Sequence, residues 1–243
     1  MTVEVCANSI QSALNAQVAG ADRIELCQNL AEGGTTPSYA AIDFCVRELQ
    51  IPTFVLIRPR AGDFCYSETE LHLIAQEVLQ CKKMGVVGVV VGFLNADFTV
   101  DVEATSKIVA LAAPMQVTFH RAFDLCIDHA QALEAVVGCG CHRILTSGGA
   151  TSALAGVDVL KKIIDKAASR IKIIAAAGIN AQNVATIINK THVDEVHASC
   201  KHSITTAEPT HSLLKQELSN FTYTESNILE IKQLIKNSHI HQL

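Results

Sequence analysis

Val117-Thr-Phe-His-Arg-Ala-Phe-Asp124 is a stretch that begins as a strand and ends in side chains that carry protons and charge. Val, Thr and Phe favour a pleated sheet that is covered on its faces. His120, Arg121 and Asp124 follow them directly. Strands that are apolar inside and ionisable at the C-terminal end are typical of a (β/α)₈ barrel, whose top face holds the chemistry. The stretch predicts such a barrel if the rest of the chain repeats it.

Similar strands recur along the chain, with helical patterns between them. Alternating strands and helices predict a parallel sheet with right-handed crossovers, and eight units permit closure of the sheet. We therefore predict one (β/α)₈ TIM-barrel domain over residues 1–243, with a doubly wound open sheet as the alternative. The expected strands are Val3–Cys6, Arg23–Cys27, Thr53–Arg58, Val86–Gly92, Gln116–Arg121, Arg143–Ser147, Ile171–Ala177 and Val193–His197.

Several helix starts are marked by capping residues. Asn8 with Gln11, and Ser67 with Glu70, have the spacing of a capping box. Thr36 precedes a proline and is expected to cap the next helix. These signals support the alternation of strands and helices.

The region after the last strand departs from the repeat. Residues 203–224 are polar and include Pro209 and His211, and an amphipathic pattern through Ile228, Ile231 and Leu234 follows them. We expect a polar excursion over the barrel mouth, or an oligomer contact, before a final helix.

The composition fits a soluble protein with a large core. Of the 243 residues, 49% are apolar and 18% are charged, which is too apolar for disorder. With a net charge of −5 and no cluster of Lys and Arg, the chain offers no basic surface for nucleic acid or an anionic membrane. No apolar run approaches a membrane span, and the first residues lack the pattern of a signal peptide. We expect a cytoplasmic protein that binds neither nucleic acid nor membrane.

The nine cysteines follow no zinc-finger or zinc-ribbon spacing. The one close pair, Cys139 and Cys141, has no matching second pair. Because the cysteines are spread through apolar segments, most are expected to be small buried side chains in a reducing compartment.

The first two strands carry the same short pattern, Glu4-Val-Cys6 and Glu25-Leu-Cys27. Side chains alternate along a strand, so each Glu shares a face with its Cys, and the intervening residues pack under the helices. We expect both pairs to point into the barrel at similar height. Either they form a functional site, or the carboxylates pair with Arg58 or Arg121 and the cysteines only fill space.

The third strand runs into a loop dense in polar groups. Arg58 continues the inward face of the strand, and a guanidinium suits bidentate recognition of carboxylate or phosphate. Arg60 and Asp63 follow in the same loop. The alternative for Arg58 is a structural role as the counter-ion of Glu25 or Glu4.

Other strand ends add candidates for proton transfer and anion binding. His120 points inward by register and is expected to exchange a proton or bind metal, and His197 ends the eighth strand. Glycines at strand ends let backbone N–H groups approach an anion, although they are also ordinary turn residues. The turn candidates are Ser147, Gly148, Gly178 and Ser199.

These residues lie in stretches by which the chain resembles the CutC family of copper homeostasis proteins over almost its whole length. The tail beyond Ser203 matches poorly. The matching stretches are Glu4–Cys6, Gly20–Cys27, Glu32–Ser38, Ile57–Arg60 with Gly62–Phe64, Val117–Asp124, Arg143–Gly148 and Glu195–His197.

The resemblance implies a cytoplasmic TIM barrel, often oligomeric, that handles copper and binds Cu(I); it implies no particular reaction. The turn Ala175-Ala-Ala-Gly178 departs from the family, whose members often have more glycine there, and this weakens a phosphate site at that turn.

Two functions follow. In the first, Cys6 and Cys27 bind Cu(I), because soft thiolates select the reduced ion. In the second, the barrel is an isomerase-like or lyase-like enzyme acting on a small anionic metabolite. The catalytic candidates for the second function are Glu4, Glu25, Arg58, His120, Arg121, Asp124 and His197, and the substrate contacts are Arg60, Asp63, Ser147, Gly148, Gly178 and Ser199. A non-catalytic scaffold is a third possibility.

Overall fold

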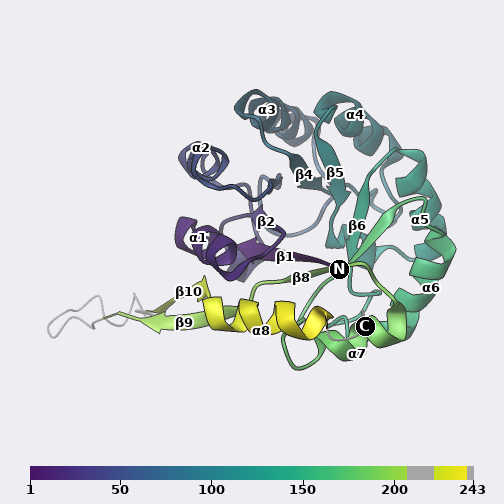
Figure 1. The fold of residues 1–243 in the computed structure, drawn as a ribbon. Coiled ribbons are helices and arrows are strands. Elements are labelled where there is room, and N and C mark those ends of the chain that lie inside the picture. The colour runs from purple at the N-terminus through teal and green to yellow at the C-terminus, as the bar shows by residue number, and fades with distance from the viewer. Residues whose placement is uncertain (207–221, 240–243) are drawn as a thin grey trace, which may run out of the picture.

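The computed structural model describes residues 1–206 and 222–239, and it contains a closed barrel of eight parallel strands in sequence order (Figure 1). The predicted TIM barrel is therefore confirmed, and each predicted strand is present with somewhat different ends. The strands are β1 (Thr2–Ala7), β2 (Arg23–Leu26), β3 (Thr53–Leu56), β4 (Gly88–Val91), β5 (Gln116–Phe119), β6 (Arg143–Thr146), β7 (Lys172–Ala175) and β8 (Glu195–Ala198).

Helices surround the barrel on the outside (Figure 1). The last helix, α8, packs against both α1 and α7, so it closes the ring between the two ends of the repeat. The helices are α1 (Ile10–Ala19), α2 (Tyr39–Glu48), α3 (Glu68–Met84), α4 (Val102–Ala112), α5 (His129–Gly138), α6 (Val157–Ala167), α7 (Val184–Thr191) and α8 (Ile228–His239), with short 3₁₀ helices η1 (Leu30–Glu32) and η2 (Arg121–Leu125).

The main core lies between the barrel wall and the helices. Val5, Ile24 and Leu26 are fully buried there, as the alternation of side chains predicts. A smaller cluster fills the barrel interior and contains Cys6, Cys27, Phe54, Leu56 and Val90. The two Glu-x-Cys patterns therefore do face inward.

The expectation that these patterns lie at similar height is wrong. In the ladder between β1 and β2, Glu4 is opposite Arg23 and Cys6 is opposite Glu25. The strands of a barrel are staggered to allow closure. Because of this stagger, the Cys of the first Glu-x-Cys pattern lies beside the Glu of the second. In the strand ladder the second pattern is displaced by two residues relative to the first, so Cys27 lies beyond the residue that pairs with Cys6.

Helix capping agrees with the prediction at one site and differs at two. Ser67 and Glu70 form the predicted capping box of α3. Helix α1 is capped by Ser9, and the Asn8 Oδ1, the predicted cap, instead accepts the Ser12 hydroxyl. Helix α2 is capped by Ser38, because the Thr36 hydroxyl instead accepts the N–H of Arg58 and donates to Glu77.

The polar region after β8 begins with one strand and ends with another, and these two strands pair with each other. Strands β9 (Lys201–Thr205) and β10 (Thr222–Ser226) pair antiparallel and project away from the barrel beside α8 (Figure 1). The base of β10 is held to α1 by the Asn15 amide, which donates to the Ser226 oxygen. The middle of the predicted excursion, 207–221 with Pro209 and His211, lies outside the described residues.

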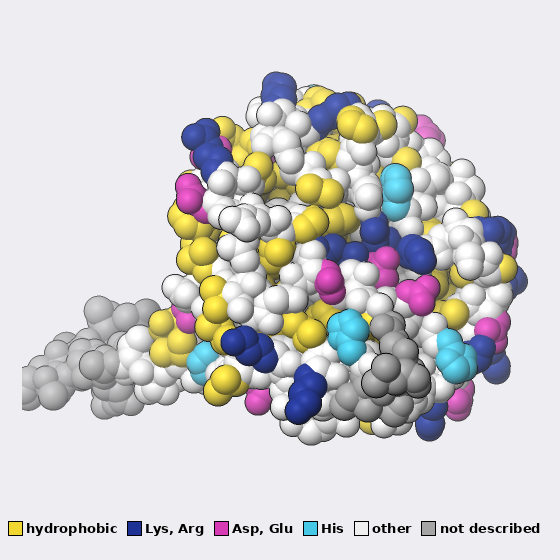
Figure 2. Space-filling model, viewed as in Figure 1, with side chains coloured by type: hydrophobic (Ala, Val, Ile, Leu, Met, Phe, Trp, Pro, Cys, Tyr) yellow, Lys and Arg dark blue, Asp and Glu magenta, His cyan; other side chains and the backbone are white. Residues whose placement is uncertain are grey.

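The surface agrees with the low charge of the sequence. Basic and acidic side chains intermingle on the face seen in Figure 2. Among the described residues, no helix is both long and apolar enough to cross a membrane.

Candidate functional site

A cavity of about 520 Å³ opens at the C-terminal ends of the strands. This volume is in the usual range of small-molecule sites, and the position is where TIM barrels carry their active sites. One side of the cavity carries the thiols of Cys6 and Cys27, and the other carries Arg58 and His120. The lining includes Cys6, Glu25, Cys27, Arg58, Phe64, His120, Arg121, Gly178, His197, Ser199 and Lys201.

The two inward cysteines meet in the wall of this cavity. The Sγ atoms of Cys6 and Cys27 lie 3.7 Å apart, and both residues are buried. The contact with Cys27 and burial raise the pKa of the Cys6 thiol well above its usual value, while the nearby His197 acts in the opposite direction. The expected meeting of these thiols across adjacent strands is therefore observed, with Cys6 protonated at neutral pH.

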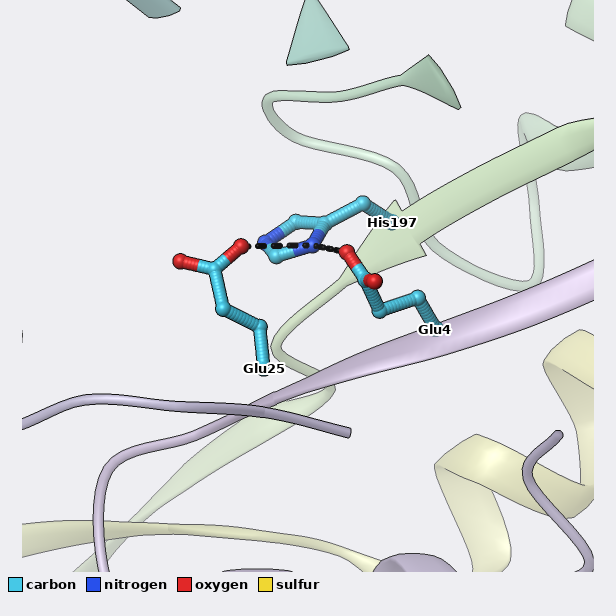
Figure 3. Close-up of side chains that lie close together, drawn as sticks. All are labelled: Glu4, Glu25 and His197. Carbon is cyan, nitrogen blue, oxygen red and sulfur yellow. Dashed lines mark hydrogen bonds and ion pairs between the residues drawn. The ribbon is translucent and has the colours of Figure 1, made fainter. Parts of the chain in front are cut away.

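The His197 ring lies between the carboxylates of Glu4 and Glu25 (Figure 3). Its Nδ1 is 2.7 Å from Glu4 Oε1 and 3.6 Å from Glu25 Oε2. Burial alone would lower the pKa of His197, but Cys6, Glu4 and Glu25 together raise it well above its usual value. His197 is thus an imidazolium ion at neutral pH, with three electron-rich neighbours.

Glu4 belongs to a buried ionic layer below the cavity. Its carboxylate pairs with Arg23, which also donates to Glu195 at 2.5 Å. Arg143 donates to the same Glu195 oxygen at 3.0 Å. Burial raises the pKa of Glu4, but Arg23 and then His197 outweigh it, and the pKa falls to about 2. Glu4 is therefore ionised and structural, and its partner is Arg23 rather than the predicted Arg58 or Arg121.

Three residues of this layer are not predicted by the sequence patterns above: Arg23, Glu195 and Arg143. A signal for the first two was present, because Arg23 alternates with Glu25 along β2 and Glu195 alternates with His197 along β8. Residues that share the inward face of a candidate belong in the same interior.

Glu25 has no comparable partner. Its Oε2 is buried and accepts no hydrogen bond from the residues that the structure describes. Burial, and then the negative charge of Glu4, raise the pKa of Glu25 to about 7, although His197 and Arg23 act against this rise. A carboxyl group in the cavity wall with this pKa changes protonation near neutral pH, which is the property of a general acid or base.

Glu4, Glu25 and His197 also offer ligand atoms within 4.8 Å of one another. In the structure those of Glu4 and His197 are already engaged, because Glu4 binds Arg23 and His197. The trio is an ion-pair network as it stands and does not by itself identify a metal site.

His120 lies on the opposite side of the cavity and is neutral. Burial and then the charge of Arg58 lower its pKa to about 3. Its Nδ1 accepts the backbone N–H of Ala122 at 3.1 Å, so the ring proton is on Nε2, which is buried without a partner. Gly92 makes room for the ring, since a Cβ there would lie 2.3 Å from it. The predicted proton exchange by His120 is therefore disfavoured near neutral pH.

Arg58 is not the counter-ion of either Glu. Its guanidinium donates to three backbone oxygens, those of Glu32, Gly34 and Gly62, at 2.7–2.8 Å. Arg58 thus holds two loops against the cavity wall while its side chain lines the cavity.

Several predicted residues have other roles. Arg60 is outside the mouth cavity and pairs with Asp63 and Glu70. Asp124 pairs with Arg121 and accepts the backbone N–H of Ser147, so these residues organise the β6 turn. Of the turn candidates, Gly178 and Ser199 line the cavity, whereas Ser147 and Gly148 do not, and neither do Asp63 and Asp124.

Comparison with known proteins identifies the family to which this barrel belongs. The model of the CutC family matches residues 1–202, which contain the barrel strands and all the cavity residues named above. The chain belongs to the CutC family. The match ends within β9, in agreement with the poor resemblance of the tail.

Curated CutC relatives and a solved CutC structure are similar over most of the chain. A family protein CutC from Vibrio cholerae is 47% identical over 201 residues, covering 82% of this chain and 79% of the relative. The CutC protein of Pasteurella multocida is 44% identical over 201 residues, covering 83% and 82%. A structure from Streptococcus agalactiae, named as a copper homeostasis protein CutC, is 30% identical with a TM-score of 0.78, covering 82% of this chain and 98% of that one.

Proposed function

We propose that this member of the CutC family handles copper by binding Cu(I) between Cys6 and Cys27. The observation that carries the proposal is the contact of the two thiols, with Sγ atoms 3.7 Å apart, in the wall of an accessible cavity. Thiolates are soft ligands that select Cu(I), and two of them suffice to hold the ion. No movement of a strand is needed to bring them together.

The surroundings suit the charge of such a complex. Two thiolates and one Cu(I) ion carry one net negative charge, and the His197 imidazolium beside Cys6 compensates it. Because thiols must lose their protons to bind the ion, copper displaces protons from the site. The ion would enter from the cavity rather than through the ionic layer below.

Cytoplasmic location and self-association form part of the proposal. All nine cysteines are free, as expected in a reducing compartment where copper is present as Cu(I). A homo-oligomer is proposed from the family resemblance. Light scattering on the purified protein tests it, and a monomer mass at micromolar concentration contradicts it.

Copper binding is tested by anaerobic titration of Cu(I) against a competing chelator. Wild-type protein should bind one equivalent, and Cys6→Ala/Cys27→Ala should bind at least 100-fold more weakly. Cys139→Ala/Cys141→Ala is a matched control, because it removes two buried thiols that do not line the cavity. Unchanged binding by the first double variant, with its fold intact by circular dichroism, contradicts the proposal.

A second candidate function is proton-transfer catalysis on a small anionic metabolite. It is favoured by Glu25, whose carboxyl has a pKa of about 7 and lines the same cavity as Arg58. Many isomerase and lyase reactions begin when such a group removes a proton next to a carbonyl. Thermal-shift screening of organic acids and sugar phosphates, followed by hydrogen–deuterium exchange into each hit, tests it. Exchange that persists at the wild-type rate in Glu25→Gln contradicts it.

A further inference from the structure

Arg58 is a buried cation without a buried anion. The residue is 5% exposed and forms no ion pair with any carboxylate in the described part of the chain. Among the described residues its guanidinium donates to three neutral carbonyl oxygens, and the Tyr66 hydroxyl lies near it. A guanidinium has five N–H donors, so two remain, and one of these is the buried, unpartnered Nε. Burying a charge in this way costs free energy unless a counter-charge is supplied.

His120, beside Arg58 in the cavity lining, also has a hydrogen-bond donor that no described residue uses. His120 is 7% exposed, and its Nε2–H is a buried donor that meets no acceptor in the described part of the chain. The ring of Phe64 contacts both groups, with its centroid 4.6 Å from the His120 ring and 5.1 Å from Arg58 Cζ. All three side chains line the mouth cavity. The side of the cavity formed after β3 and β5 therefore holds a positive charge and buried donors, without partners among the described residues, around an apolar ring.

We propose that Arg58 and His120 bind the carboxylate of a small organic acid in the mouth cavity. The inference deepens the second candidate function, and it is independent of copper binding by the thiols. Arg58 supplies the charge and a planar set of N–H donors, and His120 supplies one further N–H from a neutral ring. The acid would lie with its apolar part against Phe64.

The donors fit a carboxylate better than a phosphate. A carboxylate carries a single charge and accepts in its own plane, as a guanidinium donates. A phosphate carries more charge, and proteins usually surround it with backbone N–H groups at a helix N-terminus. On this side of the cavity Arg58 is a buried cation without a carboxylate partner among the described residues, whereas Arg121 is paired with Asp124. The Tyr66 hydroxyl near Arg58 is neutral and does not compensate the charge.

The test measures binding without turnover, so its failure is separate from a failure of catalysis. Acetate, pyruvate, lactate and succinate are titrated in turn against metal-free wild-type protein by ligand-observed NMR, beside their amides and inorganic phosphate. At least one acid should bind ten or more times more tightly than its amide and than phosphate. If every acid binds no more tightly than its amide, the proposal is overturned. If phosphate binds more tightly than the acids, the proposal is also overturned, because the site then binds phosphate rather than a carboxylate.

Variants then locate the site. Arg58→Met should weaken binding of the selected acid at least tenfold, while Arg47→Met, which removes an exposed arginine of α2, should leave it unchanged. Since Arg58 also holds two loops, its variant is replaced, if it does not fold, by a measurement on the wild type. The ¹⁵N resonance of His120 Nε2 should shift on adding the acid and stay in place on adding its amide. An unmoved resonance at saturating acid contradicts this placement.

Discussion

Cys6 and Cys27 touch through their sulfur atoms although they are not partners in the strand ladder. Cys6 lies opposite Glu25, and Cys27 is the next inward residue beyond it, directly after the end of β2, so the 3.7 Å contact between the sulfurs runs diagonally. This arrangement places a titrating carboxyl group beside the thiols. It joins the candidate copper ligands and the candidate proton carrier in one cavity wall.

Copper affinity should rise with pH. The Cys6 thiol has a raised pKa, so Cu(I) must displace its proton at and above neutral pH. Affinity should therefore increase about tenfold per pH unit for each proton released. Competition titrations at several pH values between about 6 and 9 measure this slope. A constant affinity over this range, once the pH dependence of the chelator is subtracted, would show that Cys6 is not a ligand.

Removing the charge of Glu4 should strongly destabilise the barrel. Glu4→Gln leaves the buried Arg23 with Glu195 alone and His197 without its nearest carboxylate. Breaking a buried ion pair in this way typically costs about 3–5 kcal/mol. Urea denaturation at pH 7 measures the free energy of unfolding. The control Glu134→Gln, which removes the exposed partner of Arg170, should cost less than about 1 kcal/mol. Equal losses in the two variants would rule out an energetic role of the ionic layer.

Acid should unfold the protein partly through His120. The folded state holds the pKa of His120 at about 3, against 6.5 in the unfolded chain, so the unfolded state binds the extra proton first. The stability contributed by the neutral ring is complete above pH 6.5 and is lost as the pH falls towards 3. Each pH unit in this range lowers the free energy of unfolding by about 1.4 kcal/mol, which amounts to about 3 kcal/mol between pH 6.5 and 4. The free energies of unfolding of the wild type and of His120→Gln should therefore converge as the pH falls. A constant difference between them from pH 6.5 to 4 would contradict the lowered pKa of His120.

The space beside Gly92 should not accept a methyl group. A Cβ at this position would lie 2.3 Å from the His120 ring and 2.9 Å from Ala122, so Gly92→Ala must displace the ring. We expect a loss of about 1–3 kcal/mol in stability. The control is Gly138→Ala, at the end of α5, where nothing lies within 4 Å of the added atom. It should be neutral or slightly stabilising, and chemical denaturation of both variants checks the contrast.

The sequence by itself determined the barrel and the inward direction of its key side chains. The eight strands were visible in the alternation of β-rich and helical segments. Because side chains alternate with a period of two along a strand, Glu4, Cys6, Glu25 and Cys27 had to share the interior face. The same rule applied to Arg23 and Glu195 would have found the ionic layer as well. The family was also evident, since its motifs lie at the ends of these strands.

Only the tertiary structure decided which of these groups meet. The stagger between β1 and β2 is a property of the closed barrel as a whole, and it placed Glu4 beside Arg23 and Cys6 beside Glu25. Loop paths likewise separated Arg58, which enters the cavity, from Arg60, which does not. Charge states followed from these contacts, because burial and neighbouring charges set a pKa and both depend on residues distant in sequence. Local patterns carry the direction of a side chain, whereas its partners come from the packing of the whole chain.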